Sequence, residues 1–324
     1  MRVIGAEEVE RRLTYQACIP LIREAMIALS QGRTRQLLRG IIQLGQGNMF
    51  GVMPGSLYRG REGQAAPQPA AASDGPGDLS TFGAKLVSIF PGNVAAGGLS
   101  HQGAVLLFDP ETGAPAAVID AGTLTAIRTA SASAAATDAL ARPDATRLAV
   151  LGTGEQARRH VEAIRLVRPI ESVTIWGRDP AKAAALAEAI RGATAATAAA
   201  AVAEADIICT VTGASEPILF GRDVPDGAHL NLVGSSRAGP AEVDNELVAR
   251  VRLIADHREG VLAQGAEFLR AKAAGLVGDA HVVGEIGAVF AGALPGRQHS
   301  AQLTAYKSLG SIVQDLAAAA FLLD

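Results

Sequence analysis

Three basic residues and one glycine-rich turn are the features of this chain most suited to chemistry. Arg39, Lys85 and Arg128 precede a turn at residues 152–157 with the sequence GTGEQA. Guanidinium and ammonium groups bind carboxylates through charge-assisted hydrogen bonds, so residues of these types could hold a small anion. Taken alone, however, Lys85 and Arg128 are better explained as surface or ion-paired side chains, and the turn is the stronger signal.

The turn has the spacing G-x-G-x-x-A of a dinucleotide-binding motif. Gly152 lets the chain turn sharply out of a strand, Gly154 lets a pyrophosphate approach the backbone, and Ala157 keeps the following helix close to the sheet. An apolar strand at residues 147–151 precedes the motif and a helix at residues 155–167 follows it. The start of that helix attracts phosphates. The sequence therefore predicts an NAD(P)-binding site.

The end of the next strand bears on which dinucleotide is bound. NAD enzymes usually carry an acid there for the ribose 2′-hydroxyl, and a carboxylate repels a 2′-phosphate. Here Gly177 takes that position and Arg178 follows it. We therefore expect NADP(H) to be preferred and NAD(H) to be the alternative. In the alternative, Asp179 would hold the hydroxyl and Arg178 would be a solvated loop residue.

The elements that must position these residues fall into two groups. From residue 147 onward, strands alternate with helices, which predicts an α/β fold with a doubly wound parallel sheet of the Rossmann type. The expected strands are 147–151, 172–176, 205–210, 229–233 and 253–256, with helices at 155–167 and 180–190 and a turn, short strand and helix start within 193–203.

The first part of the chain predicts an α+β domain with a largely antiparallel sheet. A helix at residues 14–30 has Thr14 as its N-cap and Gly32 as its stop. The expected strands are 40–44, 49–53, 84–90, 104–108 and 116–119, with a loop at 59–80, a hairpin turn at 109–113 and a helix at 124–140. A helix at 308–323 should pack back on this part, so we place a discontinuous substrate-binding and dimerisation domain at 1–122 and 305–324 and the nucleotide-binding domain at 123–304.

The overall composition bounds the remaining possibilities. The 324 residues are 49% apolar with a net charge of −3, and no apolar run is long enough to span a bilayer. We therefore expect no nucleic-acid or membrane partner, and a cytoplasmic location. Cys18 and Cys209 lie far apart in apolar surroundings, so we expect two buried thiols, and no spacing suggests a metal site.

Further motifs lie along nearly the whole chain. They are VMP at 52–54, KLVSIFPGN at 85–93, LLFD at 106–109, LTAIRTAS at 124–131, PGR at 295–297 and KSLG at 307–310. Together with the glycine motif, they make the chain resemble the ornithine cyclodeaminase/μ-crystallin family. The resemblance implies a homodimer formed through the substrate domain.

The resemblance also assigns the site. It places Arg39, with Arg35 as a neighbouring alternative, beside Lys85 and Arg128 around the substrate carboxylate, and gives Lys85 and Ser236 catalytic positions. The expected cofactor contacts are Thr129, Gly152, Thr153, Gly154, Gln156, Ala157, Gly177, Arg178, Thr210, Val211, Gly234, Leu309 and Gly310.

One departure from the family pattern favours a particular activity. Cyclodeaminases of the family carry a catalytic Asp where this chain has Ser236, and the Ser-Arg version resembles the ketimine reductases. Without that carboxylate, no evident base would activate a substrate amine. We therefore expect an NAD(P)H-dependent reductase of cyclic imino acids, such as Δ1-pyrroline-2-carboxylate or Δ1-piperideine-2-carboxylate, yielding proline or pipecolate. The alternatives are ornithine cyclodeaminase, then an alanine dehydrogenase, and, from another class, a non-catalytic NADPH- or ligand-binding protein.

Overall fold

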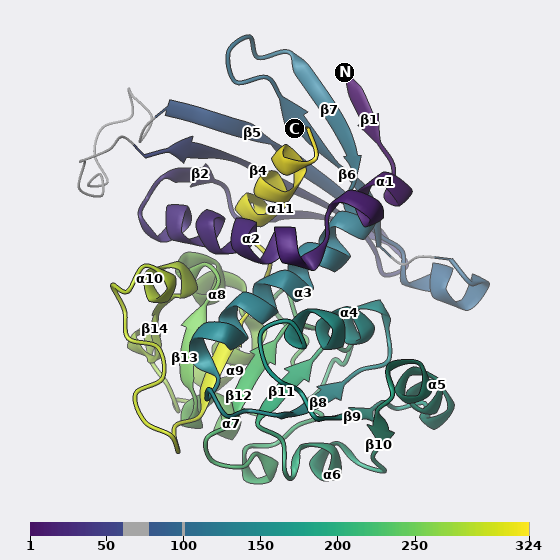
Figure 1. Cartoon of the computed structure of the whole chain (residues 1–324), viewed down its shortest axis with the longest axis vertical. Coiled ribbons are helices and arrows are strands. Elements are labelled where there is room, and N and C mark those ends of the chain that lie inside the picture. The colour runs from purple at the N-terminus through teal and green to yellow at the C-terminus, as the bar shows by residue number, and fades with distance from the viewer. Residues whose placement is uncertain (61–77, 99–100, 324) are drawn as a thin grey trace. The chain divides into compact units, whose positions relative to one another are not determined.

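The computed structural model describes residues 1–60, 78–98 and 101–323. The chain divides into two compact units. Unit 1 comprises Met1–Arg128 and Ser311–Asp324, and unit 2 comprises Thr129–Gly310 (Figure 1). These boundaries lie six residues beyond the ones expected from the sequence on each side, at 122 and 304.

Unit 1 is built on one seven-stranded sheet that is mostly antiparallel. Its order is β1 (Arg2–Ile4), β7 (Pro115–Asp120), β6 (His101–Phe108), β5 (Asp78–Ile89), β4 (Asn48–Arg59) and β2 (Thr34–Gln36), with β3 (Gly40–Gly45) also paired to β4. The expected antiparallel strands are confirmed, although β4 and β5 are each twelve residues long and therefore longer than predicted. The short β1 adds a parallel pairing with β7 that the sequence did not indicate.

The helices of unit 1 are α1 (Ala6–Arg12), α2 (Tyr15–Ser30) and α11 (Ile312–Phe321). Thr14 caps α2 by accepting a hydrogen bond from the N–H of Ala17, and Gly32 follows the helix with a φ of 71°, as the sequence predicted. Helix α11 contacts α2 and strands β4, β5 and β6 (Figure 1). The C-terminal helix therefore packs on the N-terminal part, as expected.

Most of the predicted loop at residues 59–80, namely 61–77, lies outside the described residues. Its two ends are not loop, because Arg59 closes β4 and Asp78 opens β5, and the two strands are paired there. The hairpin turn at 109–113 is confirmed, since Asp109 accepts hydrogen bonds from the N–H groups of Glu111 and Thr112. Helix α3 (Ala121–Leu140) begins three residues earlier than expected and carries the chain from unit 1 into unit 2.

Unit 2 contains an eight-stranded parallel sheet, which confirms the doubly wound α/β prediction. Its order is β10 (Ala193–Thr194), β9 (Ser172–Trp176), β8 (Arg147–Leu151), β11 (Ile207–Thr210), β12 (His229–Leu232), β15 (Thr304–Lys307), β13 (Arg252–Ala255) and β14 (Val282–Glu285). The direction of the strand order reverses between β8 and β11, which is where open parallel sheets bind ligands. Strand β15, which the sequence left unassigned, sits between β12 and β13, and this explains why residues 305–310 belong to unit 2.

The helices of unit 2 connect these strands (Figure 1). They are α4 (Glu155–Ile164), α5 (Pro180–Ile190), α6 (Ala198–Val202), α7 (Asn245–Arg250), α8 (Arg258–Gln264), α9 (Ala266–Ala273) and α10 (Ile286–Phe290). Helix α4 ends three residues before the predicted residue 167, and the short elements predicted within 193–203 are present as β10 and α6. No helix among the described residues is both long and apolar enough to cross a membrane.

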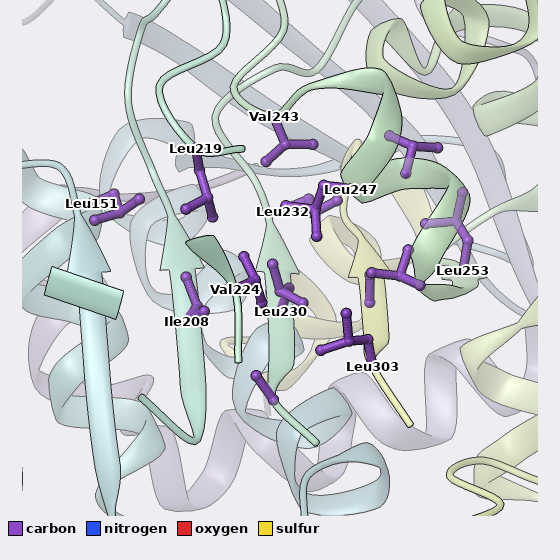
Figure 2. Close-up of a cluster of buried hydrophobic side chains, with 14 of the residues drawn as sticks. Leu151, Ile208, Leu219, Val224, Leu230, Leu232, Val243, Leu247, Leu253 and Leu303 are labelled. Carbon is purple, nitrogen blue, oxygen red and sulfur yellow. The ribbon is translucent and has the colours of Figure 1, made fainter. Parts of the chain in front are cut away.

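One face of the unit 2 sheet is buried by a cluster of aliphatic side chains (Figure 2). Leu151, Ile208 and Leu230 come from the strands β8, β11 and β12, while Leu247 comes from α7 and Leu219 from a loop. The strands read as continuous apolar runs because a parallel sheet is covered on both faces. This core holds the carboxyl ends of β8, β11 and β12 in register.

Candidate active site

Two of the predicted substrate residues of unit 1 meet at one buried carboxylate. Asp315 of α11 accepts through the same oxygen, Oδ1, a hydrogen bond from Lys85 Nζ at 3.0 Å and one from Arg128 Nε at 2.9 Å. The side chains of Lys85, Arg128 and Asp315 are 5%, 4% and 0% exposed. We call these three residues the basic cluster. Its members come from β5, α3 and α11.

Two neutral groups also accept hydrogen bonds from the basic cluster. Lys85 Nζ donates to Thr125 Oγ1 at 2.6 Å, and that hydroxyl in turn donates to the carbonyl oxygen of Ala121. Arg128 Nη1 donates to Gln314 Oε1 at 2.9 Å. Lysine has three donors and arginine five, so both cations keep N–H groups that no described residue accepts.

The strand pattern explains why Lys85 lies inside unit 1. Alternate residues of β5, including Thr81 and Lys85, point to the buried face of the sheet, which α11 covers. Burial lowers the pKa of Lys85 to about 8, and the positive charges of Arg128 and Arg39 act in the same direction, while Asp315 opposes them. The pKa of Asp315 lies below its ordinary value, because the two cations outweigh its burial.

Arg39 also lies close to this cluster, in the segment between β2 and β3. Its Nε donates to the sulfur of Met53 at 3.4 Å, and Met53 is the cross-strand neighbour of Lys85. Arg39 is partly buried, whereas the alternative residue, Arg35, is exposed on β2. The structure therefore brings the three predicted substrate residues, Arg39, Lys85 and Arg128, into one region of unit 1.

In unit 2, the glycine motif forms the turn that a dinucleotide requires. Gly152 has a φ of 140°, and a Cβ built on it would lie 2.8 Å from the carbonyl oxygen of Val211. Only glycine fits this backbone angle and this close approach. Ala157 is fully buried, which keeps α4 close to the sheet. Thr153 and Val211, both predicted cofactor residues, lie beside this turn.

The start of α4 has donors to offer an anion. Gly154 is the N-cap, and no side chain accepts a hydrogen bond from the first turn of this ten-residue helix. Unsatisfied N–H groups at a helix start bind phosphate. Gln156 stands in this first turn with its side-chain oxygen buried and without a hydrogen-bond partner among the described residues. The turn and the helix start together fit the pyrophosphate of a nicotinamide dinucleotide.

The end of β9 carries Gly177, Arg178 and Asp179. Asp179 caps α5, and its Oδ1 accepts hydrogen bonds from the N–H groups of Ala181 and Lys182. Arg178 is exposed and has no hydrogen-bond or ion-pair partner among the described residues. A Cβ on Gly177 would lie 2.4 Å from Thr153 Cγ2, so this position is closed to larger residues unless Thr153 changes.

A buried glutamate that the sequence did not single out organises the ends of β11 and β12. Glu242 accepts hydrogen bonds from Thr210 Oγ1 at 2.8 Å, from the N–H and hydroxyl of Thr212 at 2.6 and 2.8 Å, and from the N–H of Gly234 at 2.7 Å. Two predicted cofactor residues, Thr210 and Gly234, are therefore held by one carboxylate. The hydroxyl of Thr210 uses its single proton in this contact.

The loop after β12 is anchored through Ser235, the residue that precedes the predicted Ser236. Lys307 Nζ donates to the carbonyl oxygen and hydroxyl of Ser235 at 2.7 and 2.9 Å and pairs with Glu267 at 2.8 Å. Ser235 also donates to Glu267. Lys307, Glu267 and Ser235 are buried, while Ser236 is partly exposed beside them. The neighbouring anchor thus presents Ser236 at the end of the sheet.

The remaining predicted cofactor residues lie at the ends of unit 2. The N–H groups of Leu309 and Gly310 each donate to Asp256 Oδ2 at 2.7 Å, so their backbone donors already have an acceptor within the protein. Thr129 is 7% exposed at the start of unit 2. Cys18 and Cys209 are both buried and not joined to each other, as expected, and burial raises the pKa of Cys209 to about 12.

Sequence reasoning missed Asp315, Gln314 and Glu242. Asp315 and Gln314 are a polar pair within the otherwise apolar stretch Ile312–Phe321, which could have flagged them. Glu242 stands alone in a loop, and no local pattern distinguishes it from a surface glutamate. All three acquire their contacts from residues distant in the sequence.

Comparison with known proteins agrees with this architecture. The chain is 36% identical over 324 residues to the ketimine reductase mu-crystallin of Mus musculus, an alignment that covers 99% of this chain and 96% of the relative. It is 36% identical to a Delta(1)-pyrroline-2-carboxylate reductase of Bacillus cereus over 251 residues, covering 75% of this chain and 77% of the relative.

The solved structures point the same way. The Thermococcus litoralis Delta(1)-pyrroline-2-carboxylate reductase in complex with NADH and L-proline superposes with a TM-score of 0.89 at 28% identity, covering 99% of this chain and 96% of that one. The sequence profile of the ornithine cyclodeaminase/mu-crystallin family matches residues 69–324. The chain belongs to the ornithine cyclodeaminase/mu-crystallin family.

Proposed function

We propose that this protein is an NAD(P)H-dependent reductase of cyclic imino acids. The observation that carries the proposal is the charge of the basic cluster. Lys85 and Arg128 are buried and share a single carboxylate, Asp315, so the cluster keeps an excess of positive charge. Buried charge that is not balanced is costly, and the carboxylate of a small substrate would balance it.

The donors left over in the cluster suit this substrate. Arg128 Nη2 donates to no described residue, and a guanidinium can hold a carboxylate with two parallel bonds. Lys85 has one N–H beyond those given to Asp315 and Thr125. That N–H can donate a proton to the ring nitrogen, since an ammonium of pKa about 8 is a competent acid near neutral pH.

The reduced nicotinamide supplies the hydride that saturates the C=N bond. The chain's own part is to bind and orient, which is most of the catalysis that such a reaction needs. The names of the relatives support an imino acid as the acceptor, since they include ketimine and Delta(1)-pyrroline-2-carboxylate reductases. The structure with bound NADH and L-proline supports the same pairing of ligands.

We further propose that NADP(H) is preferred over NAD(H). Asp179 is engaged as the cap of α5, which weakens the alternative in which it holds the ribose hydroxyl. Arg178 is exposed and has no partner among the described residues, so its guanidinium is available to a 2′-phosphate.

A substrate panel tests the proposed function. Absorbance of NADPH and NADH would be followed with Δ1-pyrroline-2-carboxylate and Δ1-piperideine-2-carboxylate, and ammonia release from ornithine would be measured with NAD and NADP. We expect rapid reduction of at least one imino acid. Ammonia and proline from ornithine would instead establish a cyclodeaminase, and nucleotide binding without turnover would establish a binding protein.

We also propose that the protein is a homodimer formed through unit 1. The edge strand β3 exposes Ile42 and Leu44 at 58% and 52%, and Leu37, in the segment between β2 and β3, is 70% exposed. Large exposed apolar side chains of this kind are typical of interfaces and support the proposal. Ile42→Asp combined with Leu44→Asp should halve the mass measured by light scattering. The control Leu276→Asp changes an equally exposed leucine of unit 2, 51% exposed, and should leave the mass unchanged.

A further inference from the structure

We propose that Asp315 is the positioning residue of the basic cluster: it holds Lys85 and Arg128 in place and keeps Lys85 charged for turnover. This inference rests on the proposed function of the cluster and adds a residue that no motif of the sequence pointed to. It is carried by the bridging geometry of Asp315, by its burial, and by the surroundings of Lys85.

The first observation is that one oxygen organises two cations. Asp315 Oδ1 lies 3.0 Å from Lys85 Nζ and 2.9 Å from Arg128 Nε, and the three residues come from three different elements. Arg128 donates through Nε to Asp315 and through Nη1 to Gln314, so both N–H groups of Nη2 remain free of any acceptor among the described residues. Because the guanidinium is planar and rigid, the first two bonds fix the direction of these N–H groups. A shift of Asp315 would therefore reorient both donors that face the substrate.

The second observation is that packing does not account for a carboxylate here. Asp315 is fully buried, and its other oxygen, Oδ2, has no hydrogen-bond partner among the described residues. Buried ion clusters are weak sources of stability, and apolar residues of similar size often serve as well. The rest of α11 is apolar apart from Gln314. The two cations are thus the groups that require this charge.

The third observation concerns the charges that face Lys85. Asp315 on α11 is its one anionic neighbour in the described structure, while Arg128 on α3 and Arg39 between β2 and β3 both disfavour its protonated form, as does burial. The remaining contact is the neutral Thr125 hydroxyl. Removing the charge of Asp315 would leave Lys85 buried among like charges, and its pKa would fall further below the ordinary value.

The test compares Asp315→Asn with Gln314→Leu in the full-length enzyme. Gln314 contacts Arg128 from the same helix but carries no charge. For each variant, kcat and KM for the imino acid would be measured with NADPH from pH 6 to pH 10. Asp315→Asn should move the alkaline limb of kcat to lower pH by about one unit or more, the scale for losing an opposite charge at this distance. Gln314→Leu should raise KM and leave the limb in place.

Two further measurements keep the result interpretable. The conservative variant Asp315→Glu should restore the limb, and NADPH titration should show that each variant is folded. Because the chain has four lysines, NMR of lysine-labelled protein can follow Lys85 directly, with Lys85→Arg to assign its signal. Its titration midpoint should lie near pH 8 in the unmodified protein and fall in Asp315→Asn.

The two possible failures are distinct. An unmodified protein that reduces no imino acid would contradict the proposed function, whereas the NMR titration would still decide the role of Asp315. An unchanged Lys85 midpoint and an unchanged alkaline limb in Asp315→Asn would overturn the inference, whatever the substrate proves to be.

Discussion

At the scale of single residues, the basic cluster shows how an ion pair can also be a binding site. Lys85 and Arg128 donate to Asp315, yet each retains N–H groups for another acceptor. One carboxylate cannot neutralise both cations, so the pairing within unit 1 does not remove the need for a substrate anion. The ion-paired and the functional interpretations of these residues are therefore compatible.

The first prediction concerns Arg128. Arg128→Ala should lower kcat/KM for the imino acid by about 2–4 kcal/mol, the scale for removing one charge-assisted partner from a desolvated site. The affinity for NADPH, measured by fluorescence titration, should change much less. Arg11→Ala removes an exposed arginine of α1 and serves as the control. If kcat/KM for the imino acid is unchanged in Arg128→Ala, the assignment of the substrate carboxylate to this cluster is wrong.

The second prediction concerns the end of β9. The unmodified protein should bind NADPH more tightly than NADH, and Arg178→Ala should weaken NADPH by about 1–3 kcal/mol while sparing NADH. Gly177→Asp should reverse the preference only together with Thr153→Ser, because the Thr153 methyl stands 2.4 Å from the new Cβ.

The single variant Thr153→Ser is the control for this reversal, since it removes only the methyl group. Dissociation constants for both cofactors would be measured on all five proteins: the unmodified protein, the three single variants and the double variant. A preference for NADH in the unmodified protein, or equal affinity, would contradict the assignment of Arg178.

At the scale of elements, buried side chains at the carboxyl ends of the strands position the loop after β12. Glu242 ties the end of β11 to the start of the loop after β12, and Lys307 of β15 anchors the same loop through Ser235. Element ends carry unsatisfied backbone donors, and buried carboxylates satisfy several of them at once. The loop that presents Ser236 is consequently fixed from two sides.

The third prediction tests this loop. Ser236→Asp should impair imine reduction, because a new carboxylate in the loop after β12 puts a negative charge two residues from the predicted cofactor residue Gly234, and the dinucleotide is itself an anion. The unmodified protein should release little ammonia from ornithine, since a serine hydroxyl is a poor base at neutral pH. Ser236→Asn matches the size without the charge. Equal impairment by Asn and Asp would show that charge is not the cause.

The stability of the folded molecule should depend on pH, because unit 2 contains two buried histidines with lowered pKa values. Burial lowers the pKa of His160 to about 4 and that of His229 to about 3. His160 is held by the Gln156 carbonyl and the Ser133 hydroxyl, and His229 by the Thr304 hydroxyl. Both remain neutral in the folded protein at pH values where they would be charged in the unfolded chain.

The fourth prediction follows from this difference. When the pKa of a histidine is lower in the folded protein than in the unfolded chain, the folded state is fully favoured above the unfolded pKa of about 6.5. This contribution to the free energy of unfolding is lost as the pH falls from there toward the folded pKa. The free energy of unfolding should therefore drop below about pH 6.5 by roughly 1.4 kcal/mol per pH unit for each histidine. Urea unfolding followed by fluorescence of Trp176, the one tryptophan, reports on unit 2.

Two variants make this prediction specific. His160→Gln should reduce the slope of the free energy of unfolding against pH, between pH 6.5 and pH 5, by the roughly 1.4 kcal/mol per pH unit expected for one histidine. His299→Gln changes an exposed histidine and should keep the full slope. A stability that is flat down to pH 5 would mean that these histidines gain protons without unfolding.

Local sequence patterns were enough to predict the α/β class, the dinucleotide turn and most strands of both sheets. These features depend on local patterns: alternation or apolar runs for strands, and glycines where the backbone needs them, as at Gly152. The sequence motifs also indicated the family, and the family resemblance predicted Lys85 and Arg128 as site residues. The sequence did not predict strands β14 and β15 or helices α7 to α9. Short apolar segments of this kind give no distinctive period.

The contacts between site residues that are distant in the sequence became apparent only from the folded structure. Asp315 lies 230 positions from Lys85 and 187 from Arg128 in the chain, yet it touches both. Glu242 likewise reaches Thr210 across 32 positions. Such contacts depend on strand register and on which helix covers which face, and these follow from the packing of the whole core. A buried carboxylate and a surface carboxylate look alike in sequence, because burial is a property of the fold and not of the residue.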